Sequence, residues 1–175
     1  AISSAYAAGN MELTKSYITK SFRYLLLLLL PITAVLAATA SQVLGILYGV
    51  SYLEAAPVLM LLTISAAFLA LFVTLSSIID GIGKPVLTMG ITVFFILLLS
   101  ALNYYFIPAL GIMGVVYSSL ITALLACSIA GAYVYGKFKV LFSWRSNLNI
   151  IVASLLIFLL ASVRGFQGWY VIITY

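Results

Sequence analysis

Charged side chains are scarce in this sequence of 175 residues. Only 6% of the residues are Asp, Glu, Lys or Arg, whereas soluble domains have roughly a quarter. The mean hydropathy is correspondingly high, at +1.30. So few charges could not cover the surface of a soluble protein of this size, and we predict an integral membrane protein.

Histidine is absent, and Cys127 is the single cysteine. This excludes a disulfide within the chain and makes a zinc-type site improbable, because such sites need several Cys or His ligands. Acyl transfer, metal hydrolysis and carboxylate-pair chemistry all lack their groups. The segment from Gly81 to Lys84 lacks the full spacing of a phosphate-binding loop. We therefore expect no catalytic residue, no metal and no cofactor.

Long uncharged runs make up most of the sequence. They cover residues 24–49, 55–79, 86–107 and 109–136. A helix crosses the hydrocarbon of a bilayer with about 20 apolar residues, and its backbone groups are satisfied internally. Membrane barrel strands would be shorter and would alternate in polarity. The fold class is therefore predicted to be all-α, a polytopic bundle of transmembrane helices.

We expect about five complete spans and a truncated sixth that begins near Trp169. The expected spans are residues 24–47, 56–79, 85–107, 112–136 and 148–163. Asn10 can cap an amphipathic lead-in helix that carries Glu12 in its first turn. By domain, residues 1–23 are the end of a preceding helix plus this lead-in, 24–136 are four helices of one lobe, and 137–175 are a loop and an extra helix pair. Both ends look cut, as in a piece of a longer protein.

Prolines and glycines mark the expected kinks and turns. A kink, rather than a break, is expected at Pro31, because neighbouring helices can satisfy the freed carbonyl in a membrane. The other expected turn or connection residues are Gly81, Gly83, Pro85, Pro108 and Gly111.

Basic residues predict the orientation. Seven of the eight Lys and Arg fall in alternate connections, and Arg164 is the exception. The positive-inside rule then makes the first residues and the 137–147 loop cytoplasmic, in a multi-pass protein of the cell membrane. Tyr48, Tyr52, Tyr104 and Tyr105 would lie at the outer boundary. The basic residues follow the hydrophobic runs, so they indicate topology and not nucleic-acid binding.

Small residues recur every four positions along the fourth span. They are Gly114, Ser118, Thr122, Ala126 and Ala130. In lipid, close backbone approach through small residues supplies helix packing, so we interpret this stripe as a packing surface. A solvated pathway lined by Ser118 and Thr122 is the alternative. A similar stripe on the second span runs through Thr63, Ala67, Ala70, Thr74 and Ser77.

The third span carries the candidates for lining a transport cavity, Thr92, Ser100 and Asn103. Hydroxyls in membrane helices often bond their own backbone four residues back, which favours packing. An amide cannot be satisfied in this way, so Asn103 needs another partner or water.

The order of turns and motifs resembles a known family. The segments that carry the resemblance are Ser21–Tyr24 before the leucine helix, Ile46–Gly49, Tyr52–Leu59, Ile79–Pro85 and Ile107–Gly114. In this combination the chain is similar to the C-terminal lobe of the polysaccharide flippases, which belong to the multidrug and oligosaccharide-lipid exporter superfamily.

This resemblance implies about 12 to 14 helices in two related lobes around a cavity that opens alternately to either side. It also implies the cargo, a lipid-linked oligosaccharide whose tail stays in the membrane lipid. The N-terminal lobe of the family is not in this sequence, so we expect it as a partner. A cation-coupled multidrug exporter of the same superfamily and a non-transporting membrane scaffold remain alternatives. An intramembrane carboxylate would favour the multidrug exporter, but no span contains one.

Overall fold

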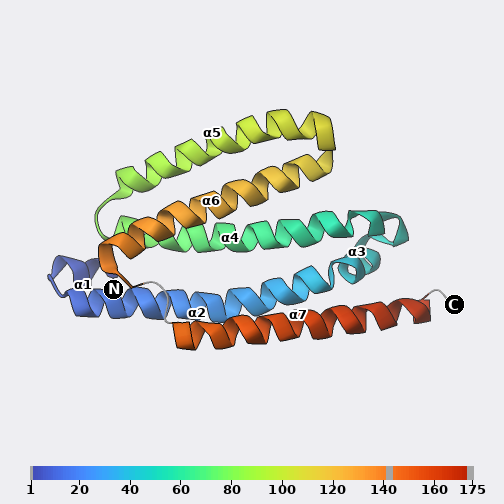
Figure 1. Ribbon diagram of the computed structural model, residues 1–175, viewed down its shortest axis with the longest axis horizontal. Helices are drawn as coiled ribbons and strands as arrows, with labels where there is room; N and C mark the ends of the chain where they lie inside the picture. The colour runs from blue at the N-terminus through green and yellow to red at the C-terminus, as the bar shows by residue number, and fades with distance from the viewer. Residues whose placement is uncertain (1, 141–143, 173–175) are drawn as a thin grey trace.

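The computed structural model describes residues 2–140 and 144–172, with side chains for 2–140 and 148–162. All regular structure in these ranges is helical (Figure 1), as predicted. The elements are α1 (Ile2–Ala7), α2 (Met11–Ala38), α3 (Ala40–Tyr48), the short 3-10 helix η1 (Val50–Ala55), α4 (Ala56–Gly81), α5 (Pro85–Leu110), α6 (Ile112–Phe138) and α7 (Trp144–Ile172).

Four helical segments in the described ranges are long and apolar enough to span a membrane. They are α2, the run of η1 and α4 over Val50–Gly81, α5 and α6. A shorter apolar stretch lies in α7 at Leu148–Ser162. The four long segments indicate a membrane-embedded protein.

The expected pair of C-terminal helices is a single helix in the structure. Helix α7 runs from Trp144 to Ile172 through Arg164, where we expected a connection. An arginine can keep its backbone hydrogen bonds and reach water with its side chain, so it need not end a helix. The 137–147 loop is also shorter than expected, because α6 extends to Phe138.

The lead-in and the first span likewise form one helix. Asn10 caps α2 as predicted, because its Oδ1 accepts a hydrogen bond from the Leu13 backbone nitrogen at 3.0 Å. The helix then continues across Pro31 and ends at Ala38, with Thr39 as its C-cap. The interruption of the first span therefore falls after Pro31, between α2 and α3.

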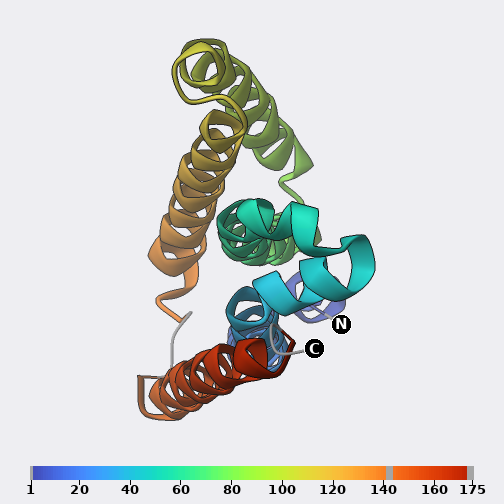
Figure 2. The same cartoon turned by 90° about the vertical axis from the view of Figure 1, so that its right-hand side faces the viewer.

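The long helices lie side by side in the order α7, α2, α4, α6 and α5 (Figure 1). Helix α6 packs against both α4 and α5, whereas α5 contacts α4 much less. Figure 2 shows α5 and α6 close together at their connection and apart at their other ends, like the arms of a V.

The segments that carry the basic residues of positions 2–140 lie toward one end of this bundle, at the left in Figure 1. Here α1, the first half of α2, the α4–α5 turn and the end of α6 meet, and the Lys137 ammonium lies 4.8 Å from the ring centre of Tyr6. We call this the basic end; the basic residues of these segments are Lys15, Lys20, Arg23, Lys84, Lys137 and Lys139. The tyrosines predicted for the opposite boundary are exposed at or near the far end.

The buried core lies in the same half of the molecule. It is formed by large side chains of α2, α4 and α6, among them Phe22, Leu75, Ile79 and Phe138. The far half has few buried side chains. The basic end is thus the more firmly packed end of the bundle.

Candidate functional site

The stripe of small residues on α6 is buried along its whole length. Gly114, Ser118, Thr122, Ala126 and Ala130 are all buried, and the spacing of four continues through Val134 and Phe138. Ser118 satisfies its hydroxyl within its own helix by donating to the Gly114 carbonyl at 2.8 Å. The stripe therefore faces neighbouring helices along almost the full length of α6.

Gly114 marks the closest approach between α5 and α6. A Cβ atom added there would lie 2.9 Å from the Ile107 backbone nitrogen, and closer still to the carbonyl of Phe106. The obstacle is backbone, which cannot rotate away as a side chain could. A glycine at this position allows the two helices to touch at the closed end of the V.

A small cavity lies where α4, α5 and α6 face each other. Its volume is about 210 Å³, and its walls come from positions well inside all three spans. We call it the hydroxyl cavity, because its polar lining consists of Ser65, Thr92, Ser119 and Thr122. Apolar side chains, including Phe72 and Phe95, form the rest of the wall.

The four hydroxyls differ in how they are bonded. Thr92 and Ser119 donate to backbone carbonyls of their own helices, at 2.9 Å and 2.8 Å. Thr122 is buried, and its Oγ1 has no hydrogen-bond partner among the described residues. Ser65 is also buried, and no described residue bonds its hydroxyl. Both residues line this cavity and neither hydroxyl is bonded by a described residue, although Thr122 Oγ1 is itself covered by its surroundings.

Of the three sequence candidates on α5, the structure places only Thr92 at this cavity. Ser100 is exposed and donates to the Ile96 carbonyl at 2.9 Å. Asn103 lies outside the cavity lining, and its buried Oδ1 has no partner within the described residues. Sequence reasoning did not single out Ser65 or Ser119 as cavity residues. A serine in the sequence is a weak indication of a cavity, since membrane helices contain many serines that bond only their own backbone.

The expected turn residues fall close to their predicted places. Gly83 and Gly111 have positive φ values of 80° and 59°, a conformation that glycine adopts without strain. Gly81 is the last residue of α4, and Pro85 is the first of α5. Pro108 is a correction, because it lies inside the last turn of α5 and the connection is reduced to Gly111.

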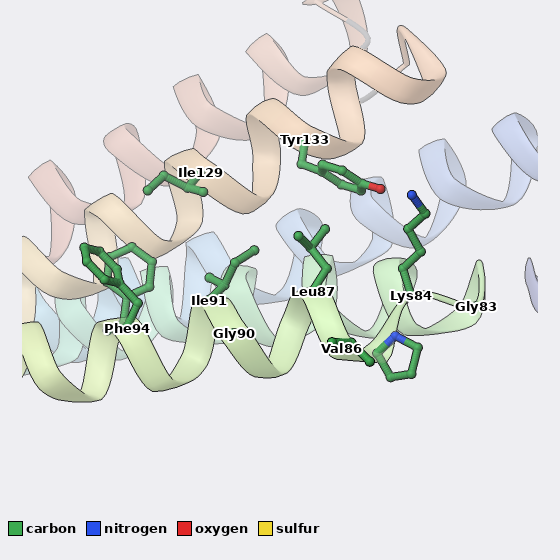
Figure 3. Close-up of a pocket in the computed structure, with 11 residues that line it drawn as sticks. Gly83, Lys84, Val86, Leu87, Gly90, Ile91, Phe94, Ile129 and Tyr133 are labelled. Atoms are coloured by element: carbon green, nitrogen blue, oxygen red, sulfur yellow. The ribbon is translucent and has the colours of Figure 1, made fainter.

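A second, larger opening lies at the basic end between the start of α5 and the end of α6 (Figure 3). We call it the crevice. Its volume is about 700 Å³, and its lining is mainly apolar, with Lys84 and Tyr133 as polar groups. Phe95 lines both the crevice and the hydroxyl cavity.

Phe95 is held in place by other aromatic rings. Its ring meets that of Phe72 edge to face at 6.4 Å and that of Phe94 at 5.3 Å between centroids. Such pairs add roughly 0.5–1.5 kcal/mol beyond their buried area. Phe95 is thus a well-packed side chain that borders both spaces.

The arrangement indicates a membrane-embedded helical protein with a mainly apolar cavity within its spans, which includes four hydroxyl side chains in its lining. In the parts of the chain that the structure describes, no three His, Cys, Asp or Glu side chains come together as a metal site would require. Comparison of the chain with protein-family models, with curated proteins and with solved structures gives no match in any of the three.

Proposed function

We propose that this chain is part of a membrane transporter that moves an amphipathic, lipid-linked saccharide across the cell membrane by alternating access. The observation that carries the proposal is the hydroxyl cavity inside the spans, with its two unbonded hydroxyls at Ser65 and Thr122. Saccharides are rich in hydroxyl groups, which exchange hydrogen bonds readily with serine and threonine.

The position of the cavity within the spans supports a path for a polar cargo. A buried hydroxyl without a partner costs free energy, and Thr122 is the residue of this cavity that has one. Buried polar atoms without a partner also occur elsewhere in the described residues, at Gln42, Ser76, Thr88 and Asn103. A cargo that supplies hydrogen bonds on its way across the membrane removes this cost while it is bound. The turn motifs resemble those of polysaccharide flippases, and this resemblance is the reason for proposing a lipid-linked saccharide as the substrate.

The packing of α5 supports a moving part. Of the four candidate spans, α5 buries the smallest share of its surface, and its main contact is α6. A helix held mainly by one neighbour, and closest to it at the α5–α6 connection, can tilt against that neighbour and against α4. In this proposal the basic end faces the cytoplasm, and the N-terminal lobe of the family supplies the other wall of the pathway.

A flipping assay with matched leucine variants tests the proposal. The full-length protein is reconstituted in liposomes with a fluorescent lipid-linked oligosaccharide, and a membrane-impermeant quencher reports which leaflet holds the label. Ser119→Leu fills the hydroxyl cavity and should slow flipping by about tenfold or more, equivalent to about 1.4 kcal/mol on the barrier.

Ser128→Leu is the matched control. Ser128 lies on the same helix, bonds its backbone in the same way at 2.8 Å and is exposed outside the cavity. Its flipping rate should stay near that of the unmodified protein. Unchanged flipping in Ser119→Leu would refute the proposed path. Cation-driven export of drugs without saccharide flipping would instead favour the multidrug exporter, and the absence of any transport would favour the scaffold.

A further inference from the structure

The crevice at the basic end combines one cation with a long apolar wall. Lys84 stands at its mouth, at the turn before α5, and the lining continues past Leu87, Ile91 and Phe94 on α5. Figure 3 shows the Lys84 side chain reaching toward the phenol of Tyr133 on α6. A charged mouth above a hydrocarbon-lined groove has the polarity of a lipid, with its headgroup outside and its chain inside.

Neither polar group at the mouth is occupied by the protein itself. Within the described residues, no hydrogen bond or ion pair involves the Lys84 ammonium or the Tyr133 hydroxyl. Asp80 lies four residues before Lys84, across the α4–α5 turn, and does not pair with it. A cation at a membrane surface without an acidic partner attracts anionic headgroups, with a strength of about 1 kcal/mol for each Lys or Arg.

The apolar part of the crevice is too large to be a packing defect. Its volume of about 700 Å³ lies within the range of about 300–1,000 Å³ that is usual for ligand sites. Gly90 contributes to its width, because space is open where its side chain would be. Hydrocarbon filling this space restores the contacts that α5 lacks on this side.

We propose that the crevice binds one anionic phospholipid of the surrounding bilayer, with its phosphate between Lys84 and Tyr133 and an acyl chain along Gly90, Ile91 and Phe94. The lysine supplies the charge and the phenol donates a hydrogen bond to a phosphate oxygen. The lipid fills the open side of the V and so supports α5 where α4 does not. This inference does not depend on the proposed transport function.

The test measures which lipid is in the crevice. Trp144 and Trp169 are replaced by phenylalanine, and a Phe94→Trp reporter is introduced in the crevice of the reconstituted full-length protein. Bromine on the acyl chain of a neighbouring lipid quenches tryptophan fluorescence. Brominated phosphatidylglycerol, which is anionic, should quench the reporter at about fivefold lower mole fraction than brominated phosphatidylcholine, which has no net charge.

Lys84→Gln should remove this preference, and Lys84→Arg should keep it. Lys20→Gln provides the matched control, since Lys20 is an exposed lysine of the basic end that lies outside the crevice. Its anionic preference should be unchanged. Raising the salt concentration should weaken the preference in the unmodified protein, because ions screen exposed charges.

A Leu97→Trp reporter controls for lipid in general. Leu97 lies one turn further along α5, is 65% exposed and lies outside the crevice, so both lipids should quench it equally. Equal quenching of the Phe94→Trp reporter by both lipids would overturn the proposal, as would a preference that survives Lys84→Gln. Absence of quenching by either lipid would show that protein covers the crevice, which also overturns it.

Discussion

Position 114 has no room for even a single methyl group, because the backbone of α5 passes directly over it. We predict that Gly114→Ala destabilises the protein by about 1–3 kcal/mol, the usual cost of overpacking. Unfolding in a denaturing detergent, followed by circular dichroism, measures the change.

Gly136→Ala is the corresponding control on the same helix. No atom lies within 4 Å of the place where its Cβ would be. Alanine has a higher helix propensity than glycine, so this variant should be unchanged or up to about 1 kcal/mol more stable. Equal stability of the two variants would contradict the close approach described at Gly114.

The unbonded hydroxyl of Thr122 leads to a second prediction at the scale of a residue. Thr122→Val keeps the shape of the side chain and removes a buried group that has no partner in the described residues. The free energy of unfolding should stay the same or rise by about 1 kcal/mol, because a desolvation penalty disappears. Saccharide flipping should fall at the same time.

Thr74→Val is the comparison for Thr122→Val. The Thr74 hydroxyl is bonded to the Ala70 carbonyl at 3.0 Å and lies outside the hydroxyl cavity. This variant should flip saccharide at the normal rate. A stable Thr122→Val protein with normal flipping would show that the cavity hydroxyl takes no part in transport.

At the scale of elements, the start of α2 depends on one side chain. Asn10 accepts the hydrogen bond of the Leu13 backbone N–H, and Asn10→Ala removes that acceptor. We expect a loss of about 1 kcal/mol and faster amide hydrogen exchange in the first turn of α2, measured by mass spectrometry. Asn10→Asp should retain slow exchange, since aspartate caps equally well. Unaltered exchange in Asn10→Ala would mean that packing alone fixes this helix end.

Sequence reasoning was most accurate where turn chemistry is strong. The bounds of α4 and the start of α5 were predicted within about two residues, because Pro57 and Pro85 restrict the backbone in a way that suits a helix start and Gly83 permits the positive φ of the α4–α5 turn. Hydrophobic length alone identified the second, third and fourth spans. The first long apolar helix is Met11–Ala38 and not 24–47 as expected, and the expected span at 148–163 is a shorter apolar stretch, Leu148–Ser162.

The errors in helix boundaries came from residues whose type alone does not determine where a helix ends. Arg164 was interpreted as the end of a span, but α7 continues through it. Pro108 was interpreted as part of a connection, but a proline near the end of a helix costs little when the next residues leave the helix anyway. In both cases tertiary context, which a single sequence does not contain, sets the boundary.

The stripes of small residues on α6 and α4 show the same limit of sequence-based prediction for the candidate site. On α6 every position of the stripe is buried. On α4 the stripe is not the packing face, because Ser77 is exposed and the larger Phe72, Leu75 and Ile79 are buried. Small residues at a spacing of four show that a close approach is possible, but only the neighbouring helix determines where one occurs. Ser65 and Ser119 could not be assigned to a cavity for this reason.

At the scale of the whole molecule, the V formed by α5 and α6 predicts unequal motion at its two ends. Spin labels at Val86 and Tyr135, both exposed near the basic end, should give a broad distribution of distances in pulsed electron paramagnetic resonance. Labels at Tyr104 and Val115, near the α5–α6 connection, should give a narrow one. Equally narrow distributions at both ends would exclude a moving α5.

The contact between Phe106 and Gly114 makes α5 a lever with its fulcrum at one end. From Phe106 to the first residue of α5, Pro85, the helix rises 1.5 Å per residue, which gives an arm of about 32 Å. A tilt of about 5° at the fulcrum moves the opposite tip by roughly 3 Å, about the length of a hydrogen bond. A disturbance too small to register beside Gly114 is therefore magnified at Lys84, where it can make or break a bond to whatever lies there.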